Sequence, residues 1–114
     1  MNDSPMSTKD KNRVRNSHGS YSGQISLRRA VQKSSNVATM RIYEQLTPKT
    51  CLKYLEEMNF KYLTDSDYKY YTTCIGGFTK GTTSEEMAAG YATLKNDGVY
   101  REPTCISKIT TSDG

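Results

Sequence analysis

Two helices joined by a short polar turn are predicted from residues 26–46, which read SLRRAVQKSSNVATMRIYEQL. Ser26 fits the N-cap of a helix over residues 27–33, because its hydroxyl can accept a hydrogen bond from the first helical turn. Residues 34–36 then interrupt the helix, since serine and asparagine side chains compete for backbone hydrogen bonds and favour turns and caps. A second helix resumes at Val37 and continues beyond the middle of the stretch.

Further helix signals follow toward the C-terminus. Thr47 and Pro48 are typical of a cap and of the first position of a helix, so a third helix is predicted to begin there. Residues 60–81 show no helical period and read as a loop rich in tyrosine and glycine. Thr83 and Glu86 have the spacing of a capping box, which predicts a fourth helix.

The two ends of the chain lack this periodicity. Residues 1–24 are polar and read as an irregular segment, which leaves residues 25–114 as the helical part. Short alternating runs at residues 99–101 and 105–109 are divided by Pro103, and they predict two small strands or one strand and an extended arm. We therefore expect a mainly α fold, a small unit of about four helices with a short β arm near the C-terminus.

The size and composition indicate a thin core. A chain of 114 residues forms one domain at most. Hydrophobic residues make up 34% of it, against roughly 45–50% in typical soluble domains, so its surface either stays solvated or packs on a larger body. No apolar run is long enough to span a bilayer and no signal peptide is visible, so we expect a soluble chain.

The net charge of +4 permits a nucleic-acid or anionic partner without requiring one. The basic residues are scattered along the chain, and they do not alternate with aromatic residues as they would on a surface that stacks single-stranded nucleic acid. A free-standing, small, basic helical binding module remains the alternative interpretation. Nucleic acid is the partner that the charge would allow it.

Cysteine and histidine chemistry is sparse. Cys51, Cys74 and Cys105 are too few and too widely spaced for a disulfide framework or a metal knuckle, and their odd number leaves at least one thiol free. His18 is the single histidine, so zinc and Cys-His chemistry have little material. We expect no metal and no cofactor, and an unreactive thiol at Cys74; the pairing of the three cysteines stays open.

Residues 21–38 resemble the second-motif region of class A, bifunctional penicillin-binding proteins. In that family a tyrosine-glycine turn leads into a Thr/Ser-Leu-Arg helix that ends in Ser-x-Asn, and a second helix leaves from the asparagine. Residues 81–94 and 96–114 are similar to two segments found downstream in the same transpeptidase domain, and residues 3–5 resemble a segment ahead of the motif. Linked blocks in the right order are more specific than a lone Ser-x-Asn.

The resemblance implies an internal piece of an α/β, β-lactamase-like D,D-transpeptidase domain. Such enzymes cross-link peptidoglycan stem peptides through a serine acyl-enzyme and bind β-lactams, with Ser-x-x-Lys, Ser-x-Asn and Lys-Thr-Gly around the site. Ser34 would then supply a hydroxyl for proton relay. Asn36 would supply an amide that donates to a substrate carbonyl and accepts from the catalytic lysine.

The same resemblance implies the partners and the location of the parent protein. Stem peptides, β-lactams and the rest of the transpeptidase domain are the implied partners, and nucleic acid is not one of them. The parent would lie on the extracytoplasmic face of a bacterial membrane, held by an anchor that this chain lacks.

Two of the three active-site motifs are missing from the chain. The only serine followed by a lysine three residues later is Ser66, with Lys69, and it comes after Ser-x-Asn instead of before it, within the predicted loop. Nothing reads Lys-Thr-Gly or Lys-Ser-Gly. We interpret Ser66 as a chance match, because a motif outside its structural context is weak. The chain by itself is expected to have no acylation activity.

The chain also departs from the family at two turn positions. Thr47 stands where glycine often ends the second helix, and Asn59 stands where glycine usually precedes phenylalanine. We expect these changes to shift the backbone locally and to leave Ser34 and Asn36 in place.

Overall fold

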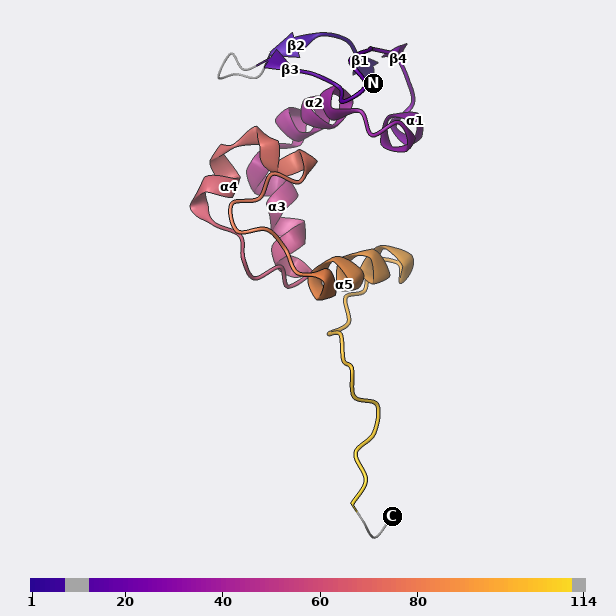
Figure 1. Ribbon diagram of the computed structural model, residues 1–114, viewed down its shortest axis with the longest axis vertical. Coiled ribbons are helices and arrows are strands. Elements are labelled where there is room, and N and C mark those ends of the chain that lie inside the picture. The colour runs from indigo at the N-terminus through magenta and orange to yellow at the C-terminus, as the bar shows by residue number, and fades with distance from the viewer. Residues whose placement is uncertain (8–12, 112–114) are drawn as a thin grey trace.

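The computed structural model of the chain describes residues 1–7 and 13–111. Its helices are α1 (Leu27–Gln32), α2 (Asn36–Leu46), α3 (Pro48–Glu57), α4 (Asp65–Lys69), the 3-10 helix η1 (Tyr71–Ile75) and α5 (Ser84–Lys95). They follow one another around an arc with α1 and α5 at its two ends, and the residues after α5 leave as a single extended arm (Figure 1). The predicted mainly α class is confirmed, and the four predicted helices are present as α1, α2, α3 and α5.

Residues 60–81 are not one continuous loop, because α4 and η1 form within them. Each is five residues long, which is too short to show the apolar period on which the prediction relied. Local side-chain bonds define them instead. The Asp67 carboxylate accepts from the backbone N–H of Thr64 at the start of α4, and Gly76 ends η1 in the left-handed region with φ of 93°.

The short strands lie near the N-terminus. β1 (Asn2–Asp3) pairs antiparallel with β4 (Gly23–Gln24), and β2 (Met6–Ser7) pairs antiparallel with β3 (Arg13–Val14). A strand of two residues shows no alternation, so the polar segment gave no sign of them. No strand forms in residues 99–111, because the arm has no neighbouring strand with which to exchange backbone hydrogen bonds. The β element predicted near the C-terminus is thus found at the other end.

α2 is the central helix, and α1, α3, η1, β1 and β3 all pack against it. Its buried face includes Val37, Met40 and Tyr43. Val37 and Met40 form a small core with Val14 of β3. The Tyr43 ring meets Tyr71 edge to face, with 5.9 Å between ring centroids. The core is as thin as the composition predicts.

A buried carboxylate ties α4 to the loop that follows η1. Asp67 is 1% exposed, and the backbone N–H and hydroxyl of Thr79 donate to one of its oxygens at 2.7 and 2.9 Å. The same two groups of Thr64 donate to the other oxygen at 2.7 and 2.9 Å. Burial by itself raises the pKa of Asp67, but these donors outweigh it and hold the pKa below its ordinary value.

A second buried carboxylate ties α5 to the loop after α3. One oxygen of Glu86 accepts from the backbone N–H of Lys61 at 2.8 Å, and the other accepts from that of Thr83 at 2.9 Å. The Glu86 N–H donates in return to the Thr83 hydroxyl at 3.0 Å, so the predicted capping box is confirmed. The donors from Lys61 and Thr83 lower the pKa of Glu86.

Thr47 and Asn59, the two positions where the resemblance leads us to expect glycine, both have positive φ. Their φ values are 71° and 59°. Asparagine is one of the few residues that tolerate this region, whereas a β-branched threonine is strained there. The backbone therefore keeps the glycine-type conformation although the residues have changed.

The buried carboxylates predict that the chain loses stability in acid. The pKa values of Asp67 and Glu86 are lower in the folded state than their ordinary values of 3.8 and 4.5, so the unfolded chain binds more protons as the pH falls through this range. The free energy of unfolding should be level near neutral pH and should decrease below about pH 4.5. Urea unfolding at a series of pH values, followed by circular dichroism, measures this.

Asp67→Asn tests the cause. It should lower the free energy of unfolding at pH 7 by about 2 kcal/mol, because an amide nitrogen then faces hydrogen-bond donors, and the difference should shrink in acid. Asp65→Asn, an exposed position of the same helix, is the control and should change stability only slightly. An Asp67→Asn chain with the same pH dependence as the parent would contradict the account.

Candidate functional site

The Ser-x-Asn sequence forms the turn between α1 and α2. The backbone N–H of Ser35 donates to Ala30 O and that of Ser34 donates to Val31 O, both at 3.0 Å. This pair of bonds is a Schellman motif, which ends a helix with one residue in the left-handed region. That residue is Ser34, with φ of 50°. α2 begins at once, because the Ser35 side chain caps it by accepting from Ala38 N.

Ser34 occupies the position that glycine usually takes in such a turn. A side chain in this conformation costs about 1 kcal/mol relative to glycine. Ser34 is exposed, and within residues 1–7 and 13–111 its hydroxyl has no hydrogen-bond partner. The serine is therefore not explained by a structural bond, and its hydroxyl is presented to solvent.

Ser35, the middle residue of the motif, points inward and is 1% exposed. Its hydroxyl lies 2.9 Å from Asp3 Oδ1 and 3.2 Å from Asn16 Oδ1. Asn16 in turn donates to Asp3 Oδ1 at 2.8 Å and accepts from Val37 N at 3.2 Å. The turn is thus fastened from the inside through its middle residue, which leaves the two flanking side chains on the outer side.

Asn36 is the first residue of α2 and is partly buried. Its Nδ2 donates to Arg15 O at 3.0 Å, and because a carbonyl can only accept, the amide nitrogen must face Arg15. Oδ1 and the second Nδ2 hydrogen remain for another partner. Beside the turn, Lys33 Nζ donates to Ser22 Oγ at 3.1 Å and places a positive charge nearby. The site can therefore offer a hydroxyl, an amide oxygen and an amide N–H.

Asp3 and Asn16 carry no sequence signal of their own. They lie 32 and 19 residues before Ser35, and no local pattern relates residues so far apart. Only the resemblance of residues 3–5 to a segment ahead of the motif pointed to this region. Burial by itself raises the pKa of Asp3, but hydrogen bonds from Asn16, the Ser22 N–H and Ser35 outweigh it and hold the pKa below its ordinary value.

Ser66 and Lys69, the other serine-lysine pair, lie on α4. This helix packs against α3 and η1, and Figure 1 shows it apart from the turn between α1 and α2. The structure therefore does not bring Ser66 together with Ser34 or Asn36.

An apolar groove of about 480 Å³ lies inside the arc of helices. It is lined almost entirely by carbon, and its walls include Leu27 and Val31 of α1, Leu55 of α3, and Tyr91 and Leu94 of α5. Four of these are more than half exposed: Leu27 (56%), Val31 (70%), Tyr91 (70%) and Leu94 (69%). α1 and α5 thus show their apolar faces to the groove without a partner among the described residues.

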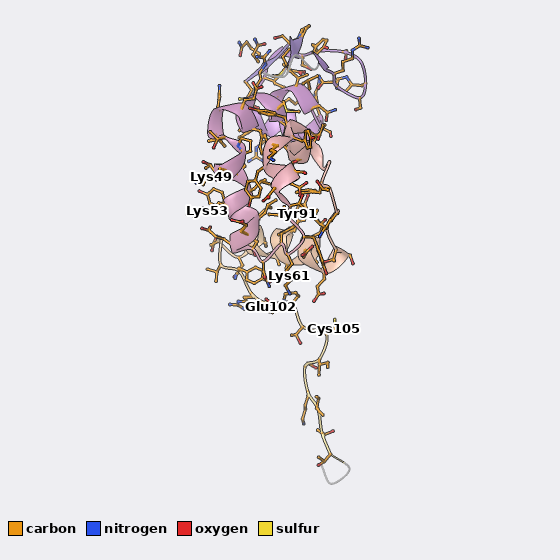
Figure 2. All side chains as sticks on the ribbon, turned by 90° about the vertical axis from the view of Figure 1, so that its left-hand side faces the viewer. Lys49, Lys53, Lys61, Tyr91, Glu102 and Cys105 are labelled. Atoms are coloured by element: carbon orange, nitrogen blue, oxygen red, sulfur yellow. The ribbon has the colours of Figure 1, made fainter. Side chains whose placement is uncertain are left out.

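The cysteines are unpaired in the structure. Burial, together with the neighbouring Cys51, raises the pKa of Cys74 to about 12, so its thiol stays protonated at neutral pH, as expected for an unreactive cysteine. Cys105 lies on the extended arm, away from the helices (Figure 2). No group of metal-binding side chains occurs within residues 1–7 and 13–111. In the same residues no helix has the length and apolar character to cross a bilayer.

Comparisons with known proteins agree with the resemblance. The family model described as penicillin binding protein transpeptidase domain matches residues 1–113. Penicillin-binding protein 1A of Streptococcus oralis is 33% identical over 101 residues, covering 83% of this chain and 15% of that protein. Penicillin-binding protein 4 of Bacillus subtilis is 32% identical (81% of this chain, 15% of that protein), and penicillin-binding protein 1A of Clostridium novyi is 27% identical (88% and 12%).

The chain spans less than a fifth of the length of these relatives. The family match begins at residue 1, so it includes the N-terminal strands and Asp3 as well as the helices. Matched over nearly its whole length and carrying Ser-x-Asn at a built turn, the chain belongs to the penicillin-binding protein transpeptidase domain family.

Proposed function

We propose that this chain contributes the Ser-x-Asn part of the active site of a D,D-transpeptidase that cross-links peptidoglycan stem peptides and binds β-lactams. The observation that carries the proposal is the conformation of Ser34. It is held at a positive φ with its hydroxyl exposed, where glycine would fit better. Strain retained at an exposed polar residue is typical of functional sites. Family membership supports the same conclusion.

The two exposed side chains suit different steps of serine acyl transfer. A serine hydroxyl attacks a carbonyl only when a base takes its proton, and that proton must later reach the leaving group. The Ser34 hydroxyl can both donate and accept, so it serves as a proton relay. The Asn36 amide donates to the substrate carbonyl through its remaining N–H and accepts from the catalytic lysine through Oδ1.

The nucleophile and the Lys-Thr-Gly segment come from other parts of the transpeptidase domain. The apolar groove supports this, because exposed apolar faces of α1 and α5 gain stability when other polypeptide covers them. The rest of the domain is the partner we assign to this groove, with residues 25–114 forming a helical part of that domain. Nucleic acid is not a proposed partner, and the parent protein acts on the extracytoplasmic face of the membrane, where its substrate is.

The chain by itself should not react with penicillin. It holds no Ser-x-x-Lys pair beside the Ser-x-Asn turn, so no hydroxyl in it is activated for attack. After incubation with a fluorescent penicillin, a denaturing gel should show no labelled band, whereas a transpeptidase with all three motifs should label. Covalent labelling of Ser66 or Ser34 would disprove this expectation.

Asn36→Ala should impair acylation in a transpeptidase domain that carries these residues together with Ser-x-x-Lys and Lys-Thr-Gly. The second-order rate constant for penicillin acylation should fall on the order of tenfold or more, because the substrate carbonyl and the lysine lose a partner. Asn96→Ala is a matched control, since Asn96 Nδ2 also donates to a backbone carbonyl, Val99 O, at 2.9 Å but lies at the end of α5. Equal rates for Asn36→Ala and Asn96→Ala would remove Asn36 from the site.

Ser34→Gly should separate stability from activity. Glycine relieves the strain at φ of 50°, so the free energy of unfolding should stay the same or rise by up to about 1 kcal/mol. Acylation in the same domain should nevertheless fall, because the relay hydroxyl is gone. Thr47→Gly is the control: it relieves a positive φ in the same way and should leave acylation unchanged. Ser34→Gly with full acylation would exclude Ser34 from proton transfer.

A further inference from the structure

The carboxylate of Asp3 is the point where three segments of the chain meet. Its Oδ1 accepts from Ser35 Oγ at 2.9 Å and from Asn16 Nδ2 at 2.8 Å, and its Oδ2 accepts from Ser22 N at 2.9 Å. Asp3 is 1% exposed, and no cation pairs with it among the described residues. Three donors therefore take the place of the water that the carboxylate loses on burial.

We propose that Asp3 is a positioning residue for the Ser34–Asn36 turn, which it holds from behind through Ser35 and Asn16. The proposal rests on the function proposed for that turn. Asp3 does not face the outer side of the turn, so it acts on the reaction only through the placement of the two exposed side chains.

The first connection runs through Ser35. A hydroxyl has one proton, and the shorter distance to the charged carboxylate directs it to Asp3 instead of Asn16. With its proton assigned, the Ser35 oxygen is left to accept from Ala38 N at 3.1 Å and so caps α2. Asp3 thereby fixes the rotamer of the middle residue. This in turn sets the direction in which the neighbouring side chains leave the turn.

The second connection runs through Asn16 to Asn36. Asn16 uses both Nδ2 hydrogens, one to Asp3 and one to Ser20 O at 3.0 Å, which holds the loop that contains Arg15. The Arg15 carbonyl accepts from Asn36 Nδ2 and orients its amide. A displacement of Asp3 would therefore move the acceptor that keeps the Asn36 oxygen directed toward its proposed partner.

Asp3→Asn removes this arrangement with almost no change in volume. All three groups around the side chain are donors, so an amide nitrogen placed among them faces at least one donor and repels it. The turn must then shift or Ser35 must reverse its hydroxyl. Small displacements of groups near reacting atoms reduce rates on the order of ten- to hundredfold.

Asp67→Asn is a matched control for the loss of a buried carboxylate. Asp67 is also 1% exposed, and it likewise accepts only from N–H and O–H donors, but these belong to Thr64 and Thr79. No hydrogen bond links Asp67 to the turn or to residues 1–7 and 13–22. A variant that only weakens the fold should resemble Asp67→Asn, whereas a variant that misplaces the turn should not.

The first measurement uses the 114-residue chain and needs no catalysis. In ¹H–¹⁵N spectra, Asp3→Asn should shift the side-chain amide resonances of Asn36 and the backbone resonances of Val37 and Ala38, while Asp67→Asn should leave them in place. The second measurement uses the transpeptidase domain that contains all three motifs. There Asp3→Asn should lower the acylation rate constant on the order of tenfold or more, and Asp67→Asn should stay within about twofold of the parent. Both rates are measured well below the unfolding temperature.

Ser35→Ala keeps the test decisive if Asp3→Asn does not fold. It removes only the bond from Asp3 to the turn, and it should lower acylation to a similar extent. Thr93→Ala removes another buried hydroxyl, which donates to Ala89 O at 2.8 Å within α5, and should leave the rate unchanged.

The outcomes distinguish the proposal from the function on which it rests. If Asn36→Ala is impaired while Asp3→Asn and Ser35→Ala acylate like the parent, Asp3 is not a positioning residue. The same conclusion follows if Asp67→Asn is impaired as much as Asp3→Asn. If Asn36→Ala is itself unimpaired, the proposed role of the turn fails and the inference fails with it, even where the spectra show that Asp3 orients Asn36.

Discussion

A carboxylate can remain inside a protein only if donors replace the water that it loses. In this chain that constraint is met three times, at Asp3, Asp67 and Glu86, each by N–H or O–H groups and none by an ion pair among the described residues. Each carboxylate joins segments that apolar packing alone would hold weakly, because the hydrophobic core is limited to a few side chains around α2. The fold depends on these polar connections to an unusual degree for a helical unit.

The turn between α1 and α2 shows how such a connection can serve function. Its middle residue, Ser35, is used for structure: it caps α2 and binds Asp3. The flanking residues Ser34 and Asn36 are then free of that task and face outward. The arrangement carries a cost of about 1 kcal/mol at Ser34, where a glycine would be relaxed. A network that is fully satisfied on the inside is able to hold this strained conformation.

The apolar groove explains the low hydrophobic content in a different way. α1 and α5 close the two ends of the arc, yet they do not pack on each other, and several of their apolar side chains remain exposed. A thin core and an uncovered apolar surface are what a helical part of a larger domain should have. The chain matches its family over nearly its whole length while spanning a small part of its relatives, which agrees with that description.

The sequence by itself determined the four main helices, the turn at residues 34–36 and the family, because caps, apolar periods and motif order act over a few neighbouring residues. It did not reveal α4, η1 or the two-residue strands, which are too short to show a period. Only the tertiary structure decided that Asp3 lies behind Ser35. The reason is physical: that hydrogen bond joins residues 32 positions apart, and it forms only once the N-terminal strands pack on α2.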